Sequence, residues 1–142
     1  MNEQVKIPGP CINFKAAVLA RLMGEKYSRA YTGLGLTNEQ VRMLLKLKGM
    51  GPVNQQGLAN ELRLEKSSFS RTIKVMIKKG LVLSKKDKGD SRQLLLSLSE
   101  KGEQMVAKIY PRWKEMHDST TMLIGQAGIA ELDRILSILL KS

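Results

Sequence analysis

Apolar residues recur at helical spacing along most of this chain. In residues 66–79 the apolar positions follow the i, i+4, i+7, i+8 spacing of one helix face: Phe69, Ile73, Met76 and Ile77. The same criterion predicts six helices, at residues 11–33, 38–48, 55–62, 66–79, 100–123 and 128–140. The pattern is therefore typical of a mainly α-helical protein in which helices pack on helices.

Local signals set the ends of these helices. Residues 37–40, Thr-Asn-Glu-Gln, form a capping box, and Asn54 and Ser99 are favourable N-cap residues for later helices. Gly80 is positioned to end the helix that precedes it. Pro111 lies within the fifth predicted helix and should kink or interrupt it, because proline lacks the amide hydrogen that a helix interior requires.

A short β-hairpin follows the fourth helix. Two apolar strands are predicted at residues 81–84 and 93–98. The segment between them, 85–92, has the sequence Lys-Lys-Asp-Lys-Gly-Asp-Ser-Arg and reads as a charged tight turn. The chain therefore places a basic hairpin directly after a basic helix.

The net charge of the chain is +11, and the positive charge is concentrated in one region. Residues 66–92 contain nine basic and two acidic residues, so one helix and one hairpin hold most of the excess. A charge that served only solubility would be spread over the surface. The clustering instead favours a polyanionic partner, either nucleic acid or an anionic membrane surface.

The composition argues against several other classes of protein. Cys11 is the single cysteine and His117 the single histidine, so neither an internal disulfide nor a structural zinc site of the usual kind can form. No apolar run approaches the length of a membrane span, and the N-terminus lacks the apolar core of a signal peptide. Phosphate-cradling loops, paired carboxylates and serine–histidine pairs are not evident. We therefore expect a non-enzymatic protein without a cofactor or metal, located in a reducing cytoplasm.

The helices predicted at 55–62 and 66–79 are separated by a short turn and form a helix-turn-helix. In such a motif the second helix enters the major groove of duplex DNA. Its outward residues are candidates for DNA contact: Ser67, Ser68, Ser70, Arg71, Lys74 and Lys78. Arg71 is the best candidate for reading guanine, and the serine hydroxyls can donate to phosphate or base acceptors. The alternative is an ordinary solvated helix face, which the adjacent basic hairpin makes less favourable.

The charged turn supplies a second set of candidates. Lys85, Lys86 and Lys88 suit phosphate contacts, which add affinity and salt dependence but no specificity. Asp90 and Arg92 are two residues apart and point to the same side of an extended strand. Asp90 can therefore hold the Arg92 guanidinium and leave its remaining donors directed outward. An arginine held in this way is suited to a narrow, negative minor groove. The alternative is a local salt bridge in the turn, which has little energetic value.

In this combination the sequence resembles the MarR (multiple-antibiotic-resistance regulator) family of bacterial winged-helix transcription factors. The resemblance covers about residues 35–102 and rests on an ordered set of segments: Gly-Leu-Thr-Asn-Glu-Gln at 35–40, Gly-Leu-Ala-Asn-Glu-Leu at 57–62, Ser-Phe-Ser-Arg-Thr-Ile at 68–73, Lys-Gly-Leu-Val at 79–82, and Asp-Ser-Arg through Ser-Glu-Lys-Gly at 90–102. The implied fold class is mainly α with a small β-hairpin wing. A winged helix-turn-helix lobe at 37–99 lies between an N-terminal arm and dimerisation helix at 1–36 and C-terminal dimerisation helices at 100–142.

The resemblance also implies a function. Members are homodimers that repress, less often activate, transcription at a pseudo-palindromic promoter site in double-stranded DNA. A small ligand, or oxidation, relieves repression from a cleft between the dimer base and the DNA-binding lobe. One observation supports the dimer independently: the helix at 128–140 carries six apolar residues, too many to face one small core. No membrane partner is expected, and the site of action is the bacterial or archaeal nucleoid.

The effector is the least defined part of this hypothesis. Several residues lie on helices that would border the cleft, although each also suits a core or interface position: Arg21, Tyr27, Tyr31, Met43, Tyr110, Trp113 and His117. Cys11 stands at the start of the first helix, a position that suits a redox-sensing thiol, so an oxidation-responsive regulator is an alternative. A DNA-binding dimer with no effector, and a winged-helix module that binds RNA or another protein, are further alternatives.

Overall fold

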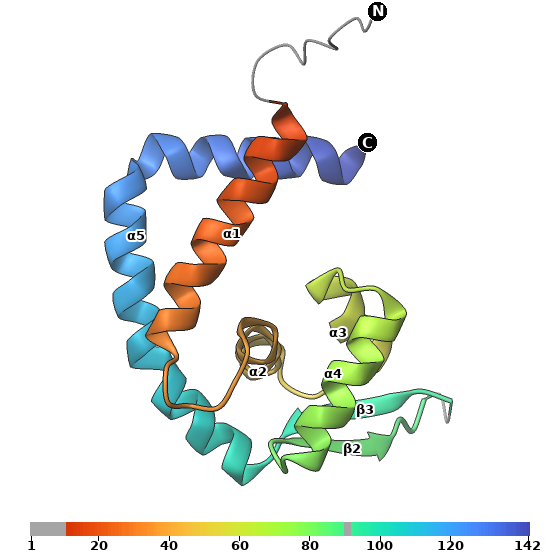
Figure 1. Cartoon of the computed structure of the whole chain (residues 1–142). Coiled ribbons are helices and arrows are strands. Elements are labelled where there is room, and N and C mark those ends of the chain that lie inside the picture. The colour runs from red at the N-terminus through yellow and green to blue at the C-terminus, as the bar shows by residue number, and fades with distance from the viewer. Residues whose placement is uncertain (1–10, 90–91) are drawn as a thin grey trace, which may run out of the picture.

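The computed structural model describes residues 11–89 and 92–142. Its elements follow the chain in this order: α1 (Ile12–Ala30), α2 (Asn38–Met50), β1 (Val53–Asn54), α3 (Gln55–Leu62), α4 (Lys66–Lys78), β2 (Val82–Lys86), β3 (Leu94–Leu98) and α5 (Glu100–Lys141). Figure 1 shows α2, α3, α4 and the hairpin gathered into one lobe, with α1 and much of α5 extending away from it. The prediction of a mainly helical fold with a small hairpin is confirmed.

The three strands form an antiparallel sheet in the order β1-β3-β2. In the hairpin, Val82 pairs with Leu98 and Lys86 with Leu94. On the other side of β3, Val53 pairs with Leu96. The strand at 53–54 was not predicted, because two residues are too few to show an alternating pattern. It forms only through pairing with a strand that lies about forty residues later in the chain.

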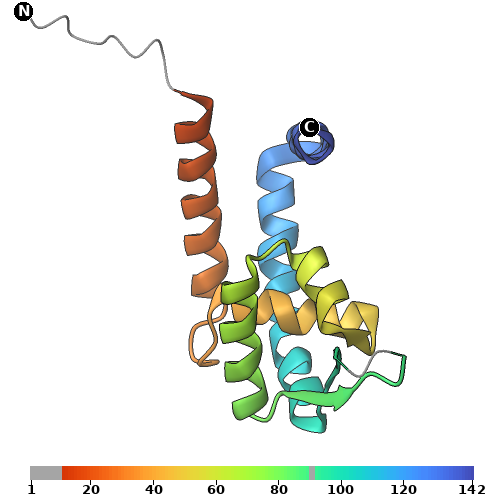
Figure 2. The same cartoon turned by 90° about the vertical axis from the view of Figure 1, so that its right-hand side faces the viewer.

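The prediction of two helices after the hairpin, the first interrupted at Pro111, needs one correction. The helical backbone continues through Pro111, and within α5 it breaks at Gly125, where φ is 83° and ψ is 162°. Pro111 is tolerated because it lies on the exposed side of α5, where water can satisfy the carbonyl left without a partner. Gly125 adopts a positive φ that side chains disfavour, and the chain turns there, as Figures 1 and 2 show.

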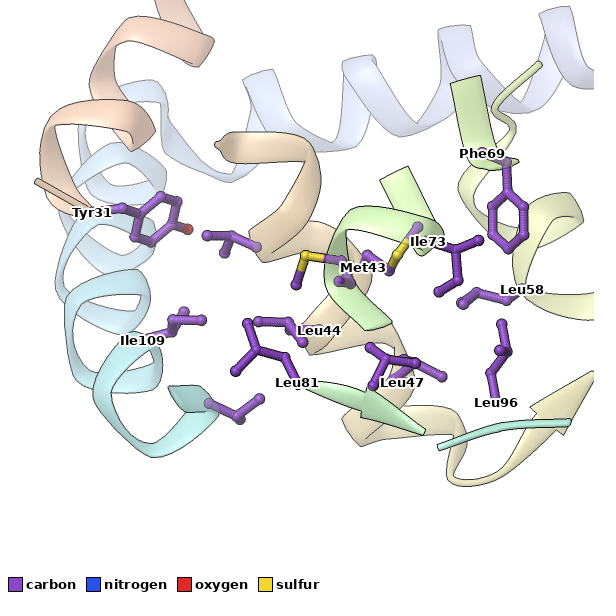
Figure 3. Packing of buried hydrophobic residues seen from close by; sticks show 14 residues of the cluster. Tyr31, Met43, Leu44, Leu47, Leu58, Phe69, Ile73, Leu81, Leu96 and Ile109 are labelled. Carbon is purple, nitrogen blue, oxygen red and sulfur yellow. The ribbon is translucent and has the colours of Figure 1, made fainter. Parts of the chain in front are cut away.

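The buried core lies inside the lobe and is almost entirely aliphatic. Fully buried side chains come from α2, α3, α4, the sheet and α5, with α2 at the centre (Figure 3): Met43, Leu44, Leu47, Leu58, Met76, Leu81, Leu96 and Ile109. Each contributes about 1.5–3 kcal/mol of burial free energy. By contrast, α1 contains no buried residue. The core therefore holds α4 and the hairpin in place, while the outer helices have no core of their own within one chain.

The end of α4 is joined to the start of α5 through a tightly packed junction. Gly80 follows α4 with a φ of +75°, and the amide of Leu81 donates to the carbonyl of Met76 at 3.1 Å, a Schellman-type ending. The Ser99 hydroxyl donates to the carbonyl of Gly80 and accepts from the amide of Gly102, which caps α5. These bonds connect the end of α4 to the start of α5 and fix their relative position.

Candidate nucleic-acid interface

Helix α4 presents opposite faces to the core and to solvent. Phe69, Ile73 and Met76 are buried against the lobe. The six residues that the sequence singled out lie on the other face: Ser67, Arg71, Lys74 and Lys78 are exposed, and Ser68 and Ser70 are partly buried. The structure therefore brings these six side chains together on one surface, which we call the α4 face.

The turn before α4 sets its angle to α3. Asn54 caps α3 by accepting from the amide of Gly57 at 2.7 Å. Helix α3 then ends at Arg63, which adopts a left-handed conformation with a φ of 51°. After this reversal α4 runs from the end of α3 toward the β2–β3 hairpin (Figure 1). The geometry is that of a helix-turn-helix whose second helix is free to enter a groove.

The hairpin lies next to α4 and carries further basic residues. Lys85, Lys86, Lys88 and Arg92 are exposed. The first two belong to β2 rather than to the turn, because β2 extends to Lys86, two residues beyond the predicted end. Successive side chains on a strand point to opposite faces, so Lys85 and Lys86 face different directions.

Local hydrogen bonds form within the described part of the hairpin turn. The amide of Asp87 donates to the carbonyl of Gln93 at 3.0 Å, and the amide of Gly89 donates to the Asp87 carboxylate at 3.0 Å. Asp90 lies outside the described residues, so the expected contact between Asp90 and Arg92 stays a prediction.

The cations of the α4 face are not neutralised by neighbours. Within residues 11–89 and 92–142, Arg71, Lys74 and Lys78 form no salt bridge; the described ion pairs lie elsewhere, such as Lys46–Glu61 and Lys114–Asp118. Unpaired cations on a protruding helix create a positive potential that attracts phosphate groups. The α4 face and the hairpin thus form a continuous candidate surface for duplex nucleic acid.

A separate cavity lies between α1, α2 and α5, and we call it the α1-side cavity. It measures about 480 Å³ and brings together four of the predicted ligand residues: Tyr27, Tyr31, Trp113 and His117. The Trp113 and His117 rings stack with centroids 4.7 Å apart. Burial raises the pKa of Tyr27, and it raises the pKa of Tyr31 to about 12, so both remain phenols at neutral pH.

Three of the predicted ligand residues, Arg21, Met43 and Tyr110, do not line this cavity. Met43 is fully buried in the core and does not line the cavity, so the structure does not bring it together with the other candidates. The spacing on α2 could not distinguish its core side from its cavity side. Arg21 lines a neighbouring hollow instead.

Sequence reasoning also missed Asn38 and Arg42, which line the α1-side cavity. The Asn38 amide donates to the carbonyl of Gly24 at 2.7 Å, while its own buried oxygen accepts no hydrogen bond from any described residue. No sequence signal marked Asn38, because it follows the helix cap as an ordinary first-turn residue.

Cys11 precedes the first turn of α1 and is exposed. Its side chain makes no capping hydrogen bond. The thiol is thus accessible to solvent, and its chemistry stays an open prediction.

Taken together, a helix-turn-helix joined directly to a basic hairpin defines a winged-helix DNA-binding protein. Among the described residues, no helix is both long enough and apolar enough to cross a membrane.

Comparisons with known proteins agree with this class. The MarR family model matches residues 36–94. The HTH-type transcriptional regulator FarR of Neisseria gonorrhoeae is 27% identical over 106 residues, which cover 75% of this chain and 73% of that protein. A cysteine-to-serine mutant of MarR from E. coli, solved with operator DNA, has a TM-score of 0.80 at 16% identity and matches 90% of this chain and 92% of that one. The regulator MOSR of M. tuberculosis, solved with DNA, has a TM-score of 0.75 at 26% identity and matches 91% and 98%.

Residues 36–94 thus resemble the MarR family, and the chain shares the fold of MarR-type winged-helix proteins. FarR and MOSR are both named as transcriptional regulators.

Proposed function

We propose that the protein is a homodimeric repressor that binds a pseudo-palindromic promoter site in double-stranded DNA and is released by a small ligand. The observation that carries the DNA-binding part is the α4 face, whose cations are exposed and unpaired beside a basic hairpin. Arg71, Ser68, Ser70 and Lys74 would contact the major groove. Arg92, with Asp90 beside it, would enter the minor groove. Two similar structures, MarR from E. coli with operator DNA and MOSR with DNA, support duplex DNA as the partner.

The dimer part of the proposal rests on the helices that lack a core. On α1, Ile12 is 85% exposed and Phe14 is 65% exposed. On the last part of α5, Leu132, Ile135, Leu136 and Leu139 are between 38% and 64% exposed. Apolar surface of this extent is unfavourable in water, and a second copy would bury it. Residues 1–36 and 100–142 are then dimerisation segments around a DNA-binding lobe at 37–99.

The release part rests on the α1-side cavity. Its walls come from α1 and α5, which we assign to the dimer base, and from α2, which lies in the lobe. A ligand bound there would make different contacts in the DNA-bound and the released states of the protein. It would thereby change the distance between the dimer base and α4. The redox alternative rests on the exposure of Cys11 alone. Titrating candidate effectors and peroxide against the DNA complex separates these versions from a dimer with no effector.

Replacing Arg92 by alanine is expected to weaken operator binding by about 1–3 kcal/mol, because one specific arginine contact is lost. The melting temperature should barely change, since Arg92 is exposed. Binding is measured by titrating the selected operator at fixed salt. Lys108→Ala is the control, because it removes one exposed positive charge outside α4 and the hairpin. An Arg92→Ala protein that binds as tightly as wild type would remove the wing from the mechanism.

Replacing Lys85 by alanine is expected to lower the affinity for DNA without changing the sequence preference. If Lys85 contacts one phosphate, the slope of log affinity against log salt concentration should fall by about one. The loss should be the same for operator and unrelated duplexes. The measurement is the salt dependence of binding for both kinds of DNA. An unchanged slope would mean that Lys85 does not contact the backbone.

A further inference from the structure

We propose that Val75, on the outward side of α4, contacts the C5 methyl group of a thymine in the major groove and so contributes to sequence preference. The inference rests on the proposed function, because it concerns how α4 recognises a base in duplex DNA. It starts from the exposure of one side chain. All of α4 lies within the described part of the chain, and Val75, at 40%, is its one large apolar side chain that is exposed.

Val75 lies on the same side of α4 as the residues that we assign to the major groove. It comes four residues after Arg71 and three before Lys78, and residues three or four apart are neighbours on a helix surface. Arg71 and Lys78 are both exposed, and the buried residues of α4 lie on its other side. The valine side chain is therefore directed toward the proposed DNA surface and away from the core.

The packing of the chain does not account for a valine at this position. Among the described residues, those that form the hydrophobic core or pack against it do not include Val75. A β-branched side chain is also a weaker helix former than alanine or lysine, because its χ1 rotation is restricted in a helix. Alanine or lysine would therefore suit an exposed helix position better than valine, unless the valine has a partner outside the chain.

The surroundings of Val75 favour a polyanion over a second protein surface as that partner. Its exposed neighbours along α4 are all cations: Arg71, Lys74, Lys78 and Lys79. The centre of a protein–protein interface is depleted of lysine, whereas clustered cations attract phosphates. Figures 1 and 2 also show α4 well away from the start of α1 and the last part of α5, which we assign to the dimer base.

Thymine offers the apolar group that a valine can recognise in the major groove. The edges of the other three standard bases present hydrogen-bond donors and acceptors there, and thymine adds a C5 methyl group. The valine side chain has no donor or acceptor, so the methyl group is the feature that it can contact favourably. The neighbouring cations would bind phosphates and hold α4 close to the bases. The contact would then remove apolar surface of both partners from water.

Helix geometry places this thymine relative to the base that Arg71 contacts. Four residues of an α-helix rise by about 6 Å along its axis. This distance corresponds to roughly two base pairs of duplex DNA. The thymine should therefore lie within about two base pairs of the base that Arg71 contacts. In a homodimer the contact is made twice, so each half-site should contain one such thymine.

Replacing thymine by uracil tests the contact, because uracil lacks only the C5 methyl group and pairs with adenine in the same way. The operator is first selected with wild-type protein, and each thymine of one half-site is then replaced by uracil in turn. At one position, uracil should weaken binding by wild type by about fourfold. This is the affinity ratio that corresponds to burying one methyl-sized group.

Two variants with neighbouring truncations assign the effect to one side chain. Val75→Ala should reduce the ratio of thymine to uracil affinity at that position to less than about 1.5-fold, because the apolar branch is absent. Lys74→Ala should weaken binding to both DNAs, and lower its salt dependence, while the ratio stays at about fourfold. Both positions are exposed and alanine is the best helix former, so both variants should fold and melt within about 3 °C of wild type.

The possible failures are distinguishable. The inference is overturned if no thymine position distinguishes thymine from uracil. It is also overturned if Val75→Ala keeps the wild-type ratio, since another side chain would then contact the methyl group. In both cases wild type still binds the selected operator, so the proposed function would stand. If wild type selects no shared sequence at all, the proposed function is overturned and the inference falls with it.

Discussion

Replacing Gly102 by alanine is expected to lower the free energy of unfolding by about 3 kcal/mol, at the upper end of the cost of overpacking. A Cβ at Gly102 would lie 2.1 Å from the carbonyl oxygen of Leu81 and 3.3 Å from a methyl carbon of Leu98. The nearer atom belongs to the backbone, and it already accepts a hydrogen bond from the amide of Ser99 at 3.1 Å. The junction between α4 and α5 would have to open to admit one methyl group.

Chemical denaturation of the purified variant measures this effect. The matched control is Gly49→Ala, because that position is also helical but has open space around its Cβ. The control should gain up to about 1 kcal/mol from helix propensity. Operator binding by Gly102→Ala should fall together with stability, since the junction holds α4. A Gly102→Ala protein as stable as wild type would show that α5 does not pack against the end of α4 in this way.

Introducing a charge on the apolar face of the last part of α5 is expected to convert the proposed dimer to a monomer. Leu139 is 64% exposed and lies one helical turn from Ile135 and Leu136. Aspartate at this position would bury an unpaired carboxylate in the proposed interface. The free energy of desolvating that carboxylate exceeds the free energy that the leucine contact contributes. A monomer reads one half-site, so operator affinity should fall by roughly two to three orders of magnitude.

Sedimentation velocity and operator titration together check this prediction. Ser137→Asp adds the same charge to an exposed polar position on the same helix and serves as the control. It should remain dimeric and bind the operator normally. The dimer proposal would be contradicted by a Leu139→Asp protein that sediments and binds like wild type, because the apolar face would then have another purpose.

The sequence predicted those parts of the fold that depend on local signals. The helix at 55–62 was placed correctly from a cap and an apolar face, and the capping box at Thr37 and Gln40 is present with both hydrogen bonds. Features that depend on contacts between distant segments of the chain were harder to predict from the sequence. The strand at 53–54 exists only through pairing with β3. The break at Gly125 agrees with the gap between the helices predicted at 100–123 and 128–140. The expected interruption at Pro111 does not occur, because Pro111 falls on a solvated face, which the residue type alone does not reveal.

The candidate DNA surface was more predictable than the cavities. A helix with one apolar and one basic face packs with its apolar face on the core. The residues of the α4 face could therefore be predicted from their spacing in the sequence. Cavity walls combine residues from several helices, and their geometry depends on packing angles. Met43 and Val41 are both on α2, yet Met43 faces only the core while Val41 also lines the α1-side cavity. The placement of Asn38 and Arg42 in a cavity wall therefore required the structure.

The most direct test of the account is the selection of genomic DNA fragments by purified wild-type protein, with Arg92→Ala run alongside at the same salt concentration. We predict that wild type enriches fragments sharing an inverted repeat and that the Arg92→Ala protein recovers them poorly. Equal and salt-labile recovery of all fragments by both proteins would contradict the central claim, because the basic surface would then bind duplex DNA without reading its sequence.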